Sequence, residues 1–238
     1  MSRERWCLIA VTILVTLFVV WRLSANKPVP LQTNILYDSS PSKANPCDDV
    51  AAAAQIAIAA SRQRKGSSVR LFATGDSSTS YEPTMASSQS TPTKFHILKG
   101  REEIARANAN FVETLKHTCE MMPRARSSPI FYSVQTVVAQ MKSEQQPGGQ
   151  LWLLVITDLR ETVERQIRAA LRQRTGTKSR LPTPIDIAGI RVTICGFAET
   201  RDSRLIESER LTEVWTQLFT AAPQFEPFCP TSDTSEYP

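Results

Sequence analysis

The sequence lacks the short motifs that mark the common catalytic and metal-binding folds. It contains no C-x-x-C pair, no G-x-x-x-x-G-K-[ST] phosphate loop, no G-x-G-x-x-G and no G-x-S-x-G. Its only histidines, His96 and His117, fall on a predicted strand and at a predicted helix end, where packed or surface roles are expected. These absences argue against zinc binding, thioredoxin-like chemistry, nucleotide binding and serine-hydrolase chemistry.

The sequence also lacks a stretch of purely basic residues. Lys and Arg number 28 against 23 Asp and Glu, and the densest basic stretch, 160–180, also carries Glu161 and Glu164. Mixed runs of this kind are typical of solvated helix surfaces, whereas a nucleic-acid site needs a purer stripe with interleaved aromatics. We therefore expect no nucleic-acid partner. No N-x-[ST] acceptor occurs either, so a glycosylated surface protein is not indicated.

One long hydrophobic run is present, at the N-terminus. Residues 6–21 carry no charge, end at Arg22 and have Trp6 and Trp21 at their two ends, where indoles favour a membrane interface. With Leu23 included, a helix of this length reaches roughly the ~30 Å thickness of the hydrocarbon core. We expect residues 1–23 to form a single transmembrane helix. A cleaved signal peptide is the alternative, but the run is long for one and no good cleavage site follows.

The side of the membrane on which the domain lies is less clear from the sequence. Basic residues flank the anchor on both sides, so the positive-inside comparison is nearly a tie. Cys47, Cys119, Cys195 and Cys229 lie beyond the anchor and suit two disulfides, with three possible pairings; four unpaired thiols are the alternative. We expect an extracytoplasmic domain, either periplasmic or extracellular.

Strands and helices alternate along the rest of the chain. A linker with Pro28 and Pro30 spans 24–33, an α/β domain spans 34–222, and a proline-rich tail spans 223–238. Within the domain we predict strands at 35–37, 69–74, 94–98, 151–156 and 187–197, helices at 46–60, 101–119, 129–144, 161–174 and 203–222, and an exposed loop at 75–93. This order predicts a doubly wound, mostly parallel, Rossmann-like sheet that helices cover on both faces.

Oxygen-bearing side chains follow two of the predicted strands, where ligand sites of such sheets lie. Asp38, Ser40 and Ser42 form a D-x-S-x-S sequence after the first strand, and Asp158 follows the strongest strand. Ser128 stands at the start of a predicted helix, before Pro129. Carboxylates and hydroxyls suit Mg²⁺, Mn²⁺ or Ca²⁺ rather than zinc. The alternative is that these side chains only satisfy local backbone amides and bind no ion.

These residues and the order of the elements resemble the von Willebrand factor A (VWA) domain over residues 33–222. In that family, D-x-S-x-S, a threonine before a helix and the Asp of an I-T-D-G-like loop build a metal-ion-dependent adhesion site (MIDAS). The resemblance implies that Asp38, Ser40, Ser42, Ser128 and Asp158 are the metal ligands. Two positions depart from the pattern: Ser128 replaces Thr but keeps the hydroxyl, and Leu159 replaces the Gly that gives the loop its backbone freedom.

The resemblance implies a non-enzymatic, membrane-anchored module that binds a partner protein through a divalent ion. A structural component of a cell-envelope assembly with a metal-free site is the alternative, motivated by Leu159. A phosphohydrolase with Asp38 as nucleophile is a third hypothesis, although such enzymes usually carry a second acid where this chain has Ser40.

Overall fold

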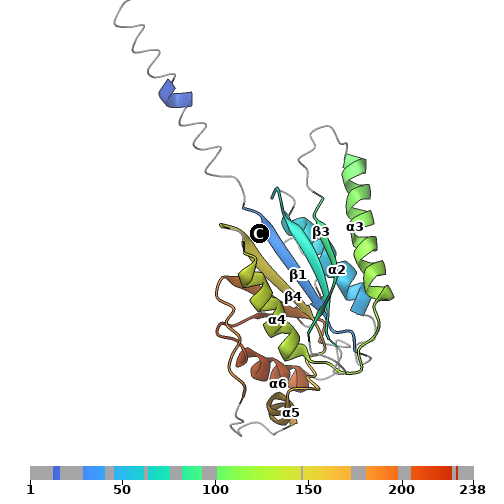
Figure 1. Cartoon of the computed structure of the whole chain (residues 1–238), viewed down its shortest axis with the longest axis vertical. Helices are drawn as coiled ribbons and strands as arrows, with labels where there is room; N and C mark the ends of the chain where they lie inside the picture. Colours follow the sequence, from blue (N-terminus) through green and yellow to red (C-terminus); the bar gives the residue numbers. More distant parts are fainter. Residues whose placement is uncertain are drawn as a thin grey trace, which may run out of the picture.

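The computed structural model describes most of the predicted domain (Figure 1). The structure describes residues 13–16, 29–40, 46–61, 64–75, 82–92, 101–145, 147–172, 181–197, 205–226 and 229. Only the backbone is described for Arg101 and for 205–208. The N-terminal anchor, the hydroxyl of Ser42 and the strand expected at 94–98 therefore lie outside the described residues, apart from four helical residues at 13–16. Within the described residues, no helix is both long and apolar enough to cross a membrane.

A six-stranded sheet forms the centre of the domain, in the order β3-β2-β1-β4-β5-β6. All neighbours pair in parallel except β3, which pairs antiparallel with β2 at the edge. The strands are β1 (Leu31–Tyr37), β2 (Ser68–Ala73), β3 (Thr84–Ser90), β4 (Gln150–Ile156), β5 (Ile190–Cys195) and β6 (Gln224–Glu226). The prediction of an α/β domain with a mostly parallel sheet is confirmed.

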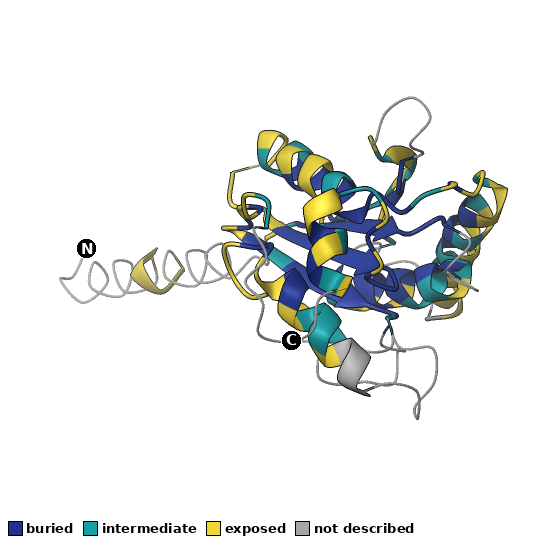
Figure 2. Cartoon of the chain, turned by 90° about the horizontal axis from the view of Figure 1, so that it is seen from below, coloured by how far each residue is buried: buried dark blue, intermediate teal, exposed yellow. Residues whose placement is uncertain are grey.

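Helices cover both faces of this sheet (Figures 1 and 2). The helices α2 and α3 pack on one face, and α4, α5 and α6 pack on the other. They are α2 (Pro46–Ser61), α3 (Arg101–Met121), α4 (Ile130–Ser143), α5 (Arg165–Arg172) and α6 (Leu205–Thr216). Because β1 and β4 are adjacent and parallel, their carboxyl ends lie side by side at one end of the sheet, where the candidate site lies.

The strand β4 shows how the sequence separates the two cores. Leu151, Leu153 and Val155 point into the cluster with α4, α5 and α6, while alternate residues of the same strand point into the cluster with α2 and α3. Each side chain is 4% exposed or less from Leu151 to Ile156. Burial of a Val, Leu or Ile side chain stabilises the fold by about 1.5–3 kcal/mol. This is the pattern of a central strand in a sheet covered on both faces.

The edge strand β3 was not predicted. It occupies Thr84–Ser90, inside the segment expected to be an exposed loop. Its sequence, TMASSQS, has little apolar character, and none of its residues is buried. Backbone hydrogen bonding to β2 forms this strand, and side-chain periodicity cannot reveal a strand that buries almost nothing.

Three further boundaries differ from the prediction. The strand β1 begins at Leu31, inside the expected linker, because residues 31–33 already pair with β2 and β4. The helix α5 begins at Arg165 rather than at Glu161. The tail contributes the short strand β6, which pairs with β5. Each difference arises from hydrogen bonds to residues distant in sequence, which local patterns do not reveal.

Two disulfides are present, as expected for an extracytoplasmic domain. Cys47 of α2 pairs with Cys119 of α3, and Cys195 at the end of β5 pairs with Cys229 of the tail. The first cross-links the two helices on one face of the sheet. The second fastens the tail to the edge at which the parallel strands end.

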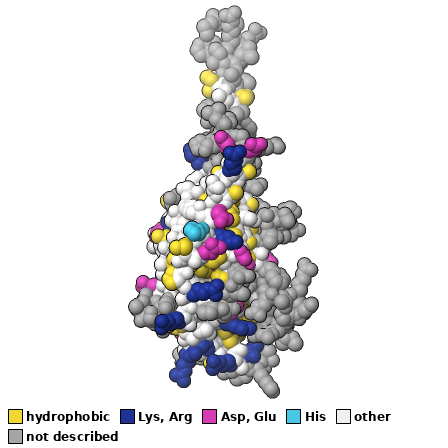
Figure 3. All heavy atoms as spheres, turned by 90° about the vertical axis from the view of Figure 1, so that its right-hand side faces the viewer, with side chains coloured by type: hydrophobic (Ala, Val, Ile, Leu, Met, Phe, Trp, Pro, Cys, Tyr) yellow, Lys and Arg dark blue, Asp and Glu magenta, His cyan; other side chains and the backbone are white. Residues whose placement is uncertain are grey.

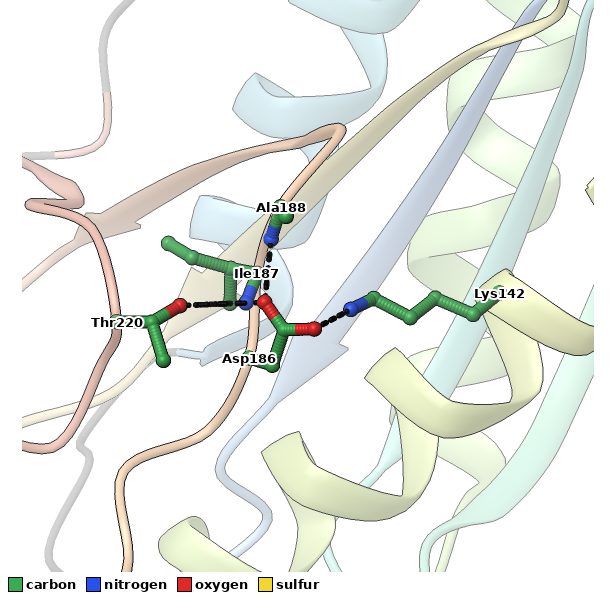
Figure 4. A network of polar contacts seen from close by, with 5 residues as sticks. All are labelled: Lys142, Asp186, Ile187, Ala188 and Thr220. Atoms are coloured by element: carbon green, nitrogen blue, oxygen red, sulfur yellow. Dashed lines mark hydrogen bonds and ion pairs between the residues drawn. The ribbon is translucent and has the colours of Figure 1, made fainter.

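A polar network fastens α4 to the segment that precedes β5 (Figure 4). Lys142 Nζ donates to Asp186 Oδ2 at 2.6 Å, and the other carboxylate oxygen accepts the Ala188 N–H at 3.0 Å. Thr220 Oγ1 lies 3.3 Å from the same oxygen and accepts the Ile187 N–H. The Lys142 hydrogen bond is the main reason that the pKa of Asp186 lies below its usual value, and the Ala188 N–H adds to it.

Candidate metal and ligand site

Asp38 is the first residue after β1 and is almost completely buried. Its backbone N–H still donates to the Ile156 carbonyl oxygen, at 2.8 Å, so it continues the ladder between β1 and β4. Only 1% of Asp38 is exposed. The rigid centre of the sheet therefore fixes this carboxylate in place, at the edge where the parallel strands end.

Among the described residues, only one of the two carboxylate oxygens of Asp38 has hydrogen-bond partners. Oδ1 accepts the Ser40 N–H at 2.9 Å and the Ser128 hydroxyl at 3.2 Å, and the Ser40 side chain adds a further hydrogen bond to the carboxylate. Oδ2 is buried and has no hydrogen-bond partner among the described residues. A buried carboxylate oxygen without a partner costs about 1–3 kcal/mol, more when the group is charged.

Asp158 shows the same one-sided arrangement at the end of β4. Its Oδ1 accepts the Arg160 N–H at 2.9 Å, while its Oδ2 is buried and, within the described part of the chain, has no partner. Only 5% of the residue is exposed. Two neighbouring strands thus each end in a buried carboxylate with one unsatisfied oxygen.

The two carboxylates repel each other. Burial raises the pKa of Asp38 above its usual value, and the negative charge of Asp158 raises it further; the hydrogen bonds from Ser40 and Ser128 only partly oppose these effects. Two negative charges at close range in a buried site are unfavourable unless a cation lies between them. The electrostatics of the site therefore favour a bound cation.

Ser128 comes from a third segment, the loop between α3 and α4. Its N–H donates to Thr162 Oγ1 at 2.6 Å, and its carbonyl oxygen accepts the Thr162 N–H at 3.1 Å. In the same loop, the Ala125 N–H donates to the carbonyl oxygen of Ser39 at 3.2 Å. These bonds join the loops after β1, α3 and β4, so residues far apart in sequence form one site.

Leu159 adopts the backbone conformation that a glycine would favour at this position. Its φ is +61°, a left-handed conformation that costs a non-glycine residue roughly 1–2 kcal/mol. Its side chain is fully buried in the core with α4 and α6, and its carbonyl oxygen accepts the Trp215 indole N–H at 3.0 Å. Packing and this hydrogen bond compensate for the strain, so the loop keeps its left-handed turn with leucine at this position.

Glu161 was assigned to a helix from the sequence, but it stabilises the site instead. One of its oxygens accepts the Phe131 N–H in the first turn of α4, at 2.7 Å, and the other accepts the N–H groups of Val163 and Glu164. Burial raises its pKa, against these hydrogen bonds, and the charge of Asp38 raises it further. Both oxygens are engaged, so Glu161 is a buried bridge between two segments. Its position before a helical pattern gave no signal of this role.

The donor set fits a hard divalent cation. Two carboxylate oxygens and the hydroxyls of Ser40 and Ser128 converge at one edge of the sheet, and oxygen donors of this kind suit Mg²⁺, Mn²⁺ or Ca²⁺. Among the described residues, no group of three or more His, Cys, Asp and Glu side chains is placed to hold a metal ion. Ser42, the remaining predicted ligand, lies outside the described residues.

Comparison with known proteins identifies the fold but no family. No protein-family model matches the chain, and no curated protein sequence matches it. Among solved structures, the pilus adhesin SpaC from Lactobacillus rhamnosus GG, in its open conformation, superposes with a TM-score of 0.53 at 11% identity. That alignment covers 84% of this chain and 28% of the adhesin, so the chain spans less than a third of that structure.

Two further similarities are weaker. The ArnB paralog VWA2 from Sulfolobus acidocaldarius gives a TM-score of 0.45 at 11% identity, over 85% of this chain and 43% of that chain. The SpRpn10 VWA domain gives 0.43 at 13% identity, over 86% and 90%. The order of elements found in the structure is the one that suggested the VWA resemblance, with β6 added. The domain is a VWA-like α/β fold with a six-stranded mixed sheet.

Proposed function

We propose that this chain is a membrane-anchored protein-binding module that holds a divalent cation at a MIDAS-like site. The ion is Mg²⁺, Mn²⁺ or Ca²⁺, and its ligands are Asp38, Ser40, Ser42, Ser128 and Asp158. A carboxylate of a partner protein completes its coordination. The observation that carries the proposal is the pair of buried, unpartnered oxygens of Asp38 and Asp158 at the ends of adjacent strands. A bound cation removes their repulsion and satisfies both oxygens.

The position of the site agrees with a membrane anchor before β1. The chain enters β1 at Leu31, at the amino end of the strand, and the site begins at Asp38, after its carboxyl end. Seven residues of strand separate the two by roughly 20 Å. If residues 1–23 span the membrane, the site faces away from it, toward a partner in solution or on another surface. The two disulfides support an extracytoplasmic location.

The alternatives gain less support. A metal-free structural component was motivated by Leu159, but the loop takes the left-handed turn with leucine in place. A phosphohydrolase of this kind usually carries a second acid two positions after its nucleophile, whereas that residue here is Ser40, whose N–H donates to the Asp38 carboxylate. We therefore propose that the chain is not an enzyme.

Metal binding is tested directly by titrating the full chain with Mn²⁺ and measuring free ion by electron paramagnetic resonance. We expect one Mn²⁺ per chain, displaced by Mg²⁺. Asp38→Ala should abolish binding, whereas Asp186→Asn, which removes a distant exposed carboxylate, should leave it intact. Equal Mn²⁺ binding by Asp38→Ala and the wild type would contradict the site.

Partner binding is tested with a fluorescent peptide that carries one Asp in a neutral sequence. Binding in Mg²⁺ should disappear in excess EDTA and with Asp38→Ala. Binding that survives both treatments would show that the interaction does not use this site.

A further inference from the structure

Exposed arginines surround the candidate site on the segments that hold it together. We use the term arginine rim for Arg124, Arg126, Arg160 and Arg165, all of which are exposed. In Figure 3, Lys and Arg side chains gather at the lower end of the molecule, the end away from the N-terminal residues. The carboxyl ends of the parallel strands lie at this end.

Hydrogen bonds place each member of the rim beside the site. Arg124 and Arg126 flank Ala125, whose N–H donates to the carbonyl oxygen of Ser39, between Asp38 and Ser40. The Arg160 N–H donates to Asp158 Oδ1 itself. Arg165 begins α5, three residues after Thr162, which exchanges two hydrogen bonds with Ser128. The rim therefore comes from the loops that supply the proposed ligands, and not from remote surface.

The acidic groups of this region are already engaged. Asp38, Asp158 and Glu161 are buried. Glu164, at the start of the same surface, accepts the Tyr132 hydroxyl at 2.5 Å and the Gln166 N–H at 3.0 Å. Arg124, Arg126 and Arg165 therefore form no ion pair within the described residues.

Among the described residues, acidic side chains border the rim beside Arg124 and, as Glu164, beside Arg165. A hollow of about 270 Å³ beside Arg124 is also lined by Asp48 and Glu120. Asp48 is paired with Lys116 at 2.8 Å, and Glu120 lies 3.9 Å from His117. The opposite side, toward α5, continues with Arg168 and Arg172. Arg126 does not line that hollow, and Arg165 begins a helix that carries two further arginines, so these two members are chosen for the test below.

We propose that the arginine rim selects a partner segment in which acidic residues flank the metal-bound carboxylate. This inference rests on the proposed function, because the rim surrounds the cation that would hold the central carboxylate. Carboxylates on either side of that residue would meet exposed guanidinium groups, which bind carboxylates with two parallel hydrogen bonds. A neutral segment could bind the ion but would leave Arg124, Arg126 and Arg165 without carboxylate partners.

A protein segment fits this surface better than a nucleic acid does. The densest basic stretch, 160–180, also carries Glu161 and Glu164, so the surface is not the purely basic stripe with interleaved aromatics that a nucleic acid needs. A carboxylate on the ion with further carboxylates on the rim satisfies every charge at the site.

The test uses three fluorescent peptides of equal length and the full chain in a mild detergent with Mg²⁺ at about 50 mM NaCl, where surface charges are weakly screened. The first has a central Asp flanked by four Glu, the second has the same Asp flanked by four Gln, and the third has a central Asn flanked by four Glu. We expect the first peptide to bind roughly tenfold more tightly than the second, since exposed ion pairs contribute about 0.2–1 kcal/mol each.

Charge reversal identifies the surface responsible. Arg126→Glu with Arg165→Glu should remove the roughly tenfold preference for Glu flanks. The matched control, Lys65→Glu with Arg106→Glu, changes the net charge equally at exposed positions away from the rim and should keep the preference. An unchanged preference in the rim variant would overturn the inference, even if binding still requires Mg²⁺ and the central Asp.

The remaining outcomes separate the two proposals. If the Asn-centred peptide binds as tightly as the first, or EDTA has no effect, the proposed metal function fails independently of the rim. A single-stranded DNA of similar charge that binds more tightly than the first peptide, and loses binding in the rim variant, would overturn the assignment of an acidic protein segment.

Discussion

Replacement of Asp158 by Asn should stabilise the domain without metal and prevent its stabilisation by metal. Asn keeps an oxygen that can accept the Arg160 N–H, removes one of the two buried charges and places an amide donor near the unpartnered oxygen of Asp38. Relief of one unsatisfied buried group is worth about 1 kcal/mol or more. For a domain of this size, 1 kcal/mol shifts the Tm by about 2–4 °C. In EDTA, Asp158→Asn should therefore melt a few degrees above the wild type.

Addition of Mg²⁺ or Mn²⁺ should reverse that order. An ion present at 100 times its Kd stabilises the folded state by about 2.7 kcal/mol, which corresponds to roughly 5–10 °C here. The wild type should gain this shift, and Asp158→Asn should not.

Differential scanning fluorimetry of the full chain, with and without each ion, measures both effects. Asp186→Asn serves as the control: it removes an exposed carboxylate and should keep the full ion-dependent shift. A wild type that does not respond to Mg²⁺, Mn²⁺ or Ca²⁺ would refute the metal site. An Asp158→Asn variant that melts below the wild type in EDTA would refute the electrostatic reasoning.

Three other predictions follow from the described contacts. Leu159→Gly should relieve the left-handed backbone strain but remove a fully buried side chain. We expect its free energy of unfolding, measured by urea titration, to fall by about 2 kcal/mol or more. A variant more stable than the wild type would contradict this. Cys47→Ser with Cys119→Ser opens a cross-link over a sequence separation of 72 and should cost roughly 4 kcal/mol in the same assay; a loss below about 1 kcal/mol would contradict it. The pKa of Asp186 is lowered mainly by Lys142, so its contribution is complete above its usual value of 3.8 and is lost as the pH falls through the lowered value. The Tm difference between wild type and Asp186→Asn should therefore be constant above about pH 5 and should shrink toward pH 3; a difference that grows in acid would contradict this assignment.

The sequence was sufficient for the parts of the fold that bury apolar side chains. The strand at 151–156 and the helices α2, α3 and α4 were predicted within a few residues, because their apolar patterns reflect burial against the sheet. It was not sufficient where the backbone alone pairs. The strand β3 buries none of its residues, and β6 consists of three residues in a proline-rich tail.

The candidate site was predictable in part for a similar reason. Asp38 and Asp158 follow buried strands, so their convergence follows from the topology of a parallel sheet. The contact between Ser128 and Asp38, 90 residues apart, needed the VWA resemblance to be anticipated. The role of Glu161 could not be anticipated, because it depends on backbone N–H groups of another segment. The left-handed turn at Leu159 could not be anticipated either, because tertiary packing overrides the preference of leucine for a negative φ.

The strand β1 has a mechanical consequence. It connects the point at which the chain enters the domain to the first residue of the candidate site, and it lies between two parallel strands, β2 and β4. If the chain is anchored before Leu31 and a partner pulls on the site, tension would run along this strand. Its hydrogen bonds to both neighbours would then be loaded together in shear, rather than opened one after another as in a zipper. Neither disulfide lies within this path, so resistance to force would depend on the sheet itself.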